Sequence, residues 1–103
     1  MDRSDIVQLV AKTYTQDSIG QYIESQTARP VFCNIASVTR SEWQTAGQLG
    51  FKPELVITMF GPDYQGEELA VINGVSYGVY RTYRRDDELL ELYLEKKVGE
   101  YED

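Results

Sequence analysis

The sequence predicts a mainly β protein: a small antiparallel β-barrel of about six strands with one short inserted helix. Its 103 residues suffice for one domain, and 42% of them are apolar, which is typical of a globular core. Eight tyrosines stand against three phenylalanines, and tyrosine suits half-buried sheet faces. Short antiparallel strands in so small a chain must form a sandwich or close on themselves to remove their edges. We therefore expect a single barrel domain over residues 1–103.

The first two strands are predicted over residues 5–14 and 29–38. Apolar residues alternate on one face of each strand: Val7, Leu9 and Ala11 in the first, and Val31, Cys33 and Ile35 in the second. The polar residues 15–18 and Gly20 end the first strand, whose pairing partner the pattern leaves open. Pro30 has no backbone N–H, so it must lie at the beginning of its strand or on a sheet edge.

A short helix is predicted over residues 40–49, inserted between strands. Thr39 and Glu42 have the T-x-x-E spacing of a capping box, and Gly50 follows as a stop signal. Three larger or apolar residues recur at a spacing of three: Trp43, Ala46 and Leu49. We interpret Trp43 as a packing anchor, with contact to a partner protein as the alternative.

The strongest local pattern is a hairpin formed by residues 67–72 and 75–84. Asn73-Gly74 separates these two alternating apolar runs. This dipeptide is typical of a type I′ turn, because both central residues must adopt a positive φ. We therefore expect an antiparallel pair of strands joined by a two-residue turn.

Two further strands are predicted over residues 54–60 and 88–95. The first is apolar on both faces and is therefore expected at the centre of the sheet. The second presents a row of three leucines to the core: Leu90, Leu92 and Leu94. A helix over residues 87–97 is the alternative for that segment, since Glu, Leu and Lys favour helices. Residues 61–66 form a turn-rich loop between strands.

The charge of the chain is concentrated at its C-terminal end. The net charge is −7, of which residues 1–85 contribute −1 and the acidic end from about residue 86 contributes −6. A broad duplex-DNA surface is disfavoured because phosphate binding needs a basic face. No apolar run is long enough for a membrane span and no secretory signal precedes the first strand, so we expect a cytoplasmic protein without membrane partners.

The residue types exclude most familiar catalytic sites. The chain has no histidine and a single cysteine, Cys33, so catalytic triads, Cys–His pairs and Cys/His zinc sites are excluded and no cofactor is expected. We interpret Cys33 as a buried apolar residue. The carboxylate clusters at 67–68 and 86–88 lack a calcium-loop spacing and are interpreted as solvated turns. Tyrosines at 77, 80, 83 and 93, interleaved with arginines, permit a weaker alternative, a single-strand nucleic-acid surface.

Five segments in a fixed order carry a resemblance to a known family. They are residues 37–54 with Thr39-Arg-Ser-Glu-Trp43, then Asp63-Tyr-Gln-Gly-Glu67, Asn73-Gly74, Tyr80-Arg-Thr-Tyr-Arg84 and Glu91-Leu-Tyr-Leu-Glu95. In this order, over residues 29–99, the chain resembles the head closure proteins (head–tail adaptors, connectors or stoppers) of tailed bacteriophages and prophages of Gram-positive bacteria. The resemblance implies a virion structural protein without enzymatic activity, present in the host cytoplasm before assembly.

The resemblance also implies partners. Such proteins form a homo-oligomeric ring, matching the twelve-fold symmetry of a portal, beneath the portal and adaptor rings. They retain packaged DNA, which passes through without specific binding, and dock the tail terminator or tail tube. The alternatives are a tail-completion protein of the same virion, or the single-strand-binding barrel.

Three groups of residues are candidates for these contacts. The gating segment lies between the second and third strands, with an end-plug for the barrel as the alternative: Thr39, Arg40, Glu42, Trp43, Leu49 and Phe51. Opposite charges on neighbouring subunits could form the ring interface, with a solvated surface and an acidic tail as the alternative: Arg81, Arg84, Arg85, Glu88, Glu91 and Glu95. A turn-rich loop is the candidate contact with a neighbouring ring, with an ordinary exposed connection as the alternative: Gly61, Pro62, Asp63, Tyr64 and Gly66.

Overall fold

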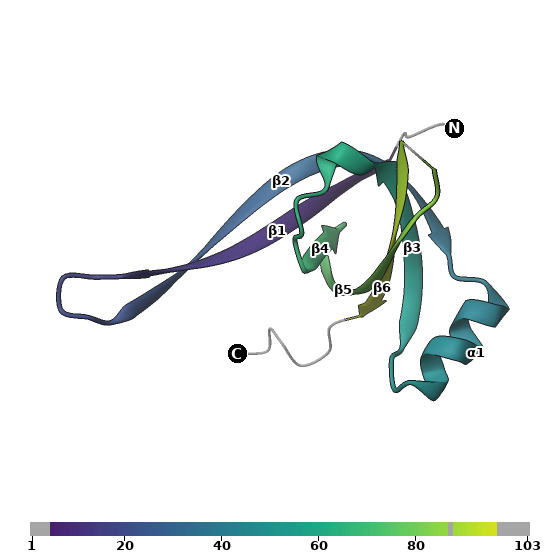
Figure 1. The fold of residues 1–103 in the computed structure, drawn as a ribbon, viewed down its shortest axis with the longest axis horizontal. Helices are drawn as coiled ribbons and strands as arrows, with labels where there is room; N and C mark the ends of the chain where they lie inside the picture. The colour runs from purple at the N-terminus through teal and green to yellow at the C-terminus, as the bar shows by residue number, and fades with distance from the viewer. Residues whose placement is uncertain (1–4, 87, 97–103) are drawn as a thin grey trace.

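The computed structural model describes residues 5–86 and 88–96, which form a closed antiparallel barrel (Figure 1). Its strands are β1 (Asp5–Gln16), β2 (Tyr22–Ser37), β3 (Pro53–Phe60), β4 (Leu69–Ile72), β5 (Val75–Arg84) and β6 (Leu89–Lys96). Around the barrel they follow the order β1-β2-β3-β6-β5-β4, and β4 pairs with β1 to close it. The predicted six-stranded barrel with one short helix, α1 (Arg40–Gln48), is confirmed.

The individual elements match the sequence pattern closely in the C-terminal half. Asn73 and Gly74 have φ values of 51° and 80°, as the type I′ turn between β4 and β5 requires. β3 lies between β2 and β6, so its apolar faces are explained by a central position. Residues 89–96 form strand β6, and the alternative helix there is wrong because β3 and β5 pair with this segment on both sides.

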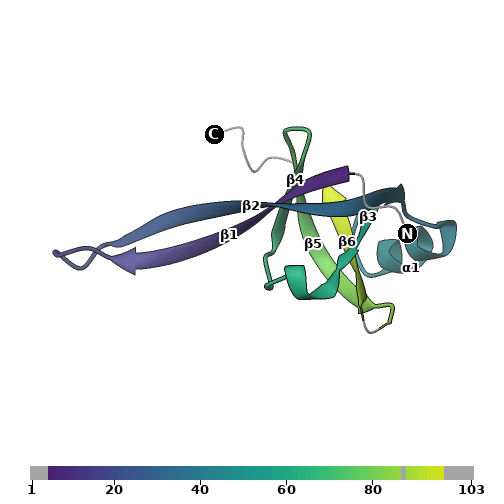
Figure 2. The ribbon, with the colours of Figure 1, turned by 90° about the horizontal axis from the view of Figure 1, so that it is seen from above.

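The N-terminal hairpin is much longer than predicted. β1 and β2 pair without interruption from Asp5↔Cys33 to Gln16↔Tyr22, so the second strand begins at Tyr22 and not at residue 29. Only the base of this hairpin belongs to the barrel. Residues 11–28, which we call the arm, extend away from it, at the opposite end of the molecule from α1 (Figures 1 and 2). The longest dimension of the molecule is 49 Å.

Pro30 illustrates why this long strand is tolerated. It lies within β2, opposite Gln8 of β1, but the pairing of β2 with β3 begins only at Cys33. Pro30 is thus on a portion of β2 that has no second neighbouring strand. Its missing N–H therefore removes no hydrogen bond to a strand on that side. The edge position predicted for it is confirmed.

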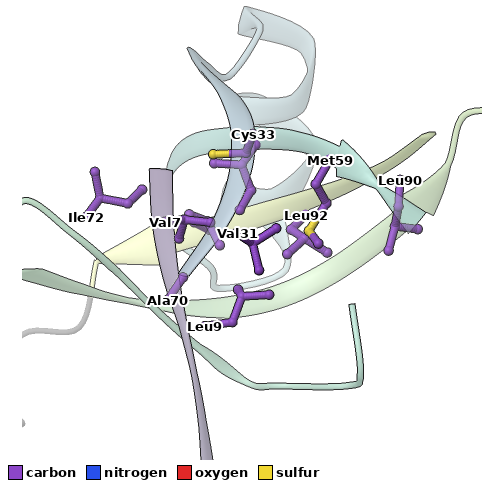
Figure 3. Close-up of a cluster of buried hydrophobic side chains, with 11 residues drawn as sticks. Val7, Leu9, Val31, Cys33, Met59, Ala70, Ile72, Leu90 and Leu92 are labelled. Carbon is purple, nitrogen blue, oxygen red and sulfur yellow. The ribbon is translucent and has the colours of Figure 1, made fainter. Parts of the chain in front are cut away.

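The core fills the barrel with inward-facing side chains from β1, β2, β3, β4 and β6 (Figure 3), and the partly buried Tyr77 and Val79 of β5 pack against them. Leu90, Leu92 and Leu94 of β6 are buried, as predicted. The central cluster comprises Val7, Leu9, Val31, Cys33, Ile57, Met59, Ala70, Ile72, Leu90, Leu92 and Leu94. Each fully buried aliphatic side chain stabilises the fold by about 1.5–3 kcal/mol relative to an exposed one. The barrel, not the arm or α1, therefore holds most of the apolar stabilisation.

Candidate functional site

The insertion between β2 and β3 carries α1, and the Thr39 half of the predicted capping box is formed, whereas the Glu42 carboxylate binds Tyr80 and Arg81 in place of the Thr39 N–H. The Thr39 side-chain oxygen accepts from the Glu42 backbone N–H at 3.1 Å. Gly50 has a φ of 93°, and the Phe51 N–H donates to the Ala46 carbonyl at 3.0 Å, which closes the C-terminal end. Thr39 therefore satisfies one helix N–H, while the Glu42 carboxylate remains free to bind outside the helix.

The Glu42 carboxylate fastens α1 to the barrel. Tyr80 donates its hydroxyl to Glu42 Oε2 at 2.6 Å, and Arg81 donates Nε to the same oxygen at 3.2 Å and Nη2 to Oε1. Phe51 stacks on Tyr80 with ring centroids 4.8 Å apart. The Arg81 guanidinium lies over the Tyr93 ring at 3.9 Å. We call these five residues, Glu42, Phe51, Tyr80, Arg81 and Tyr93, the helix clasp.

The helix clasp stabilises the ionised form of Glu42. The hydrogen bond from Arg81 lowers the pKa of Glu42 and outweighs the opposing effect of burial. Burial, followed by the bond to the Glu42 carboxylate, raises the pKa of the Tyr80 hydroxyl. Burial and the hydrogen bond to Glu91 raise the pKa of Tyr93 to about 12. At neutral pH the clasp is thus a carboxylate held by a guanidinium and a neutral phenol.

Trp43 and Leu49 do not pack against the barrel. They are 59% and 72% exposed, whereas Ala46 is the buried residue of the helix. Trp43 borders a shallow surface hollow with Arg40 and Gln44. The interpretation of Trp43 as a packing anchor, and of the helix as an end-plug formed by Trp43 and Leu49, is wrong because the contact is made by a small residue and the helix clasp.

Several charges predicted for the ring interface are paired within the subunit instead. Arg81 binds Glu42, and Arg85 Nε lies 3.7 Å from Glu91 Oε2. Glu95 Oε1 accepts from the Lys52 N–H at 3.2 Å. Arg84 and Glu88 are exposed without an ion pair to another described residue. Intramolecular pairing thus leaves these two as the most available members of the predicted set. Of the carboxylate cluster predicted at 86–88, Asp87 lies outside the described residues.

The predicted neighbour-ring loop is held firmly beside the barrel, with η1 (Gly61–Asp63) as its first turn. Gly61 is buried, and its N–H donates to the Glu88 carbonyl at 2.6 Å. A Cβ at this position would lie 3.2 Å from Arg84 Nη1 and 3.4 Å from the Glu88 carbonyl oxygen. Pro62 and Gly66 are exposed, and Gly66 has a φ of 86°. The loop offers an exposed surface on a fixed backbone.

A buried carboxylate joins this loop to the base of the arm. Arg29 donates Nε and Nη2 to Glu67 Oε2 at 3.1 and 2.6 Å, and Nη2 also reaches the Asp63 carbonyl at 2.6 Å. Glu67 Oε1 accepts from the Gln65 N–H at 2.9 Å. The Tyr64 hydroxyl donates to the Glu67 carbonyl at 2.7 Å. We call this set, Arg29, Asp63, Tyr64, Gln65 and Glu67, the arm clasp.

Glu67 corrects the prediction of a solvated turn at 67–68. It is only 5% exposed. Burial opposes its ionisation, but the hydrogen bonds from Arg29 and the Gln65 backbone outweigh burial and lower the pKa of Glu67. The partner, Arg29, is distant in sequence by 38 residues. The glutamate pair alone could not reveal this contact.

The arm is the feature that the sequence analysis missed. Every residue from 12 to 28 except Asp17 is exposed. The tip displays large apolar side chains: Tyr14, Ile19, Tyr22 and Ile23. Asp17 shapes the turn, where its Oδ1 accepts from the N–H groups of Ile19 and Gln21 at 3.0 and 2.9 Å. Residues 22–28 have no apolar alternation, and the only signal for a longer second strand was the presence of the strand-forming residues Tyr22, Ile23 and Thr27.

The other candidate residues are Cys33, the carboxylate side chains and four tyrosines. Cys33 is fully buried, and burial raises its thiol pKa to about 11, so its interpretation as a core residue is confirmed. Within residues 5–86 and 88–96, no three cysteine or carboxylate side chains gather closely enough to hold a metal ion. Of the four tyrosines, Tyr77 packs on the core and Tyr80 and Tyr93 belong to the helix clasp, while Tyr83 is exposed. They do not form a free stacking platform.

No protein-family model matches the chain, and a search of curated proteins finds no significant match. No described helix has the length and apolar character required to cross a membrane.

Proposed function

We propose that this chain is a non-enzymatic structural protein of a tailed-phage or prophage particle. In this role it forms a ring at the head–tail connector, retains packaged DNA and provides a docking surface for the tail. The observation that carries the proposal is the shape of the subunit: a closed barrel with an arm at one end and α1 at the other (Figures 1 and 2). The resemblance of the sequence to head closure proteins indicates the particle in which such a subunit would serve.

The two projections suit a protein that must contact several neighbours. A ring subunit needs two unlike lateral faces and further surfaces for the rings above and below. Because the core lies inside the barrel, the arm and α1 can make such contacts without opening it. The portal or adaptor ring would lie on one side and the tail terminator or tail tube on the other. The net charge of −7 suits a channel through which DNA slides without specific binding.

In this proposal the insertion between β2 and β3 is the gating segment. Trp43 and Leu49 are exposed and available to a partner or to the channel. The helix clasp fixes α1 through a charge-assisted bidentate contact whose side chains lie at the surface of the barrel. Movement of α1 would require this contact to break, but it would leave the core intact.

Localisation of the chain within a particle tests the proposal. We expect cryo-electron microscopy to find a ring of this chain between the portal assembly and the tail. Disruption of its gene should give full heads that lose DNA and free tails that do not join. A ring at the tip of unattached tail tubes would identify a tail-completion protein instead.

Affinity for nucleic acid separates the proposal from the single-strand-binding alternative. We expect no measurable binding of the isolated chain to single-stranded oligonucleotides at physiological salt. Tyr80 and Tyr93 are engaged in the helix clasp, and stacking on them would require it to open. Micromolar binding that Tyr83→Ala abolishes would contradict the proposal.

A further inference from the structure

The arm has two strand edges without a neighbour among the described residues. β1 pairs with β4 only from Gln8 to Val10, so its outer edge is open from Ala11 to Gln16. β2 pairs with β3 only from Cys33 onward, so its outer edge is open from Tyr22 to Phe32. Within the arm, residues 11–28, both open edges project clear of the barrel (Figures 1 and 2).

These edges lack most of the features that protect exposed strands from pairing. The β1–β2 ladder runs through the arm without a bulge, and charged side chains along its strands are few: Lys12, Glu24 and Arg29. The single proline, Pro30, lies at the base of the arm. Proteins normally block long edges with lysine, proline or bulges. A two-stranded ribbon alone is also marginally stable in water, so additional strands would stabilise this one.

A groove marks the place where an added strand could begin. It has a volume of about 380 Å³ and lies between β1, at Val10, Ala11, Lys12 and Tyr14, and residues 65–69. At its floor, β4 ends its pairing with β1 at Leu69↔Val10. A strand entering the groove would continue the line of β4 along the open edge of β1. The structure thus provides space directly beside the unpaired backbone.

We infer that the partner of each open edge is the other edge in a second copy of this chain. The β1 edge of one arm pairs with the β2 edge of the next. Copies rotated about an axis along the arm place β2 of one subunit beside β1 of its neighbour, and these strands run in opposite directions. This contact is therefore an antiparallel pair between unlike surfaces, which is the kind that repeats around a ring. The arms of the ring would form a continuous cylinder with two strands per subunit.

Rotational symmetry also fixes which residues meet. Residues at equal height along the axis remain at equal height in every copy, and Thr13 lies opposite Ser25 within one arm. Ser25 of one subunit would therefore lie near Thr13 of the next, displaced by the stagger that closure imposes. The face that carries them is uncharged within the arm: Ala11, Thr13, Thr15, Ile23, Ser25 and Thr27. New pairs on this face would bury no charge.

Cross-linking between single-cysteine variants tests this pairing. Cys33 is fully buried with a thiol pKa of about 11, so the natural chain supplies an unreactive background. Thr13→Cys and Ser25→Cys are prepared as separate, differently tagged proteins and oxidised alone and mixed at high concentration. We expect a disulfide-linked heterodimer in the mixture and little homodimer in either protein alone.

The alternative contacts give different products. Homodimers of Thr13→Cys or Ser25→Cys would show a two-fold contact between like edges, and absence of the mixed product would show that the edges do not meet. Either result would overturn the inference. Thr45→Cys on the exposed surface of α1, mixed with Thr13→Cys, controls for random collision and should give no heterodimer.

This inference rests on the ring of the proposed function. A variant with a shortened arm tests the two separately. Replacing residues 14–24 by Asn-Gly joins Thr13 to Ser25 through a two-residue turn and leaves the core residues unchanged. We expect this variant to fold and to keep the spectrum of the barrel. Cysteines at the positions that remain on the arm should no longer cross-link, and the variant should fail in particle assembly. Normal particles from this variant would refute the arm contact while leaving the head-closure role intact.

Discussion

Replacement of Arg29 by methionine would break the arm clasp at its charged centre. Methionine keeps much of the alkyl stem but removes two hydrogen bonds to Glu67 Oε2 and one to the Asp63 carbonyl. Glu67, 5% exposed, would keep its bond from the Gln65 N–H without a cation beside it. Removing one partner of a fully buried ion pair costs about 3–5 kcal/mol. The Arg29 side chain is 32% exposed, so solvent screening reduces this figure and we expect about 2–3 kcal/mol.

Arg29→Met should also change how the free energy of unfolding depends on pH. In the native protein the pKa of Glu67 is lowered, so its contribution is present above the unfolded pKa and is lost as pH falls through the folded value. In Arg29→Met, burial acts without the opposing arginine, so the pKa of Glu67 is higher than in the native protein. The folded variant then binds a proton more tightly than the native protein does. Its stability deficit should therefore shrink as pH falls from about 7 toward 4.

Urea unfolding and thermal unfolding, both followed by far-UV circular dichroism at several pH values, measure both effects. We expect the midpoint temperature at neutral pH to fall by about 10–20 °C for a domain of this size. Arg29→Met combined with Glu67→Met provides the matched control, because it removes the buried charge together with its partner, and it should be more stable than the single variant. A deficit below about 0.5 kcal/mol that is constant with pH would refute the reasoning.

Substitutions at three further positions test other parts of the fold by denaturant unfolding. Gly74→Val, at a φ of 80°, should cost more than about 1 kcal/mol because a β-branched residue resists this conformation, whereas Gly74→Asn should cost less; equal stability of both variants and the native chain would contradict the turn geometry. Leu92→Ala, at a fully buried position, should cost about 2–5 kcal/mol, and a loss below 1 kcal/mol would show a loosely packed barrel. Trp43→Ala should change stability by less than about 0.5 kcal/mol because the side chain is 59% exposed; a larger loss would restore its interpretation as an anchor.

Local patterns in the sequence predicted the barrel because each depends on residues close together in the chain. The turn at Asn73-Gly74 and the alternating leucines of β6 specify backbone angle and face within a few residues. The cap at Thr39 is likewise local. The turn and the buried face of β6 have the geometry that their patterns require, whereas only the Thr39 half of the capping box is formed because Glu42 binds Tyr80 and Arg81.

The clasps could not be predicted because they join residues about 38 positions apart. Glu42 meets Arg81, and Arg29 meets Glu67, only after the barrel has closed. Sequence alone therefore gave no sign that Arg81 binds Glu42, and it placed Glu67 in a solvated turn. The arm was missed for a different reason: its strands lie outside the core, so the apolar alternation that marks a buried face fades beyond Leu9.

A single strand connects the two projections of the molecule. β2 begins at Tyr22 near the arm tip, crosses the barrel wall and ends at Ser37, three residues before α1 begins. Its 16 residues correspond to about 50 Å of extended chain, comparable to the full 49 Å length of the subunit. The arm and the start of α1 thus lie at the two ends of one continuous strand, and a change in the direction of this strand would move both. A neighbouring subunit that binds the arm would therefore also orient the first turn of α1 at the far end of the barrel. Whether the rest of α1 follows would depend on whether the helix clasp stays closed.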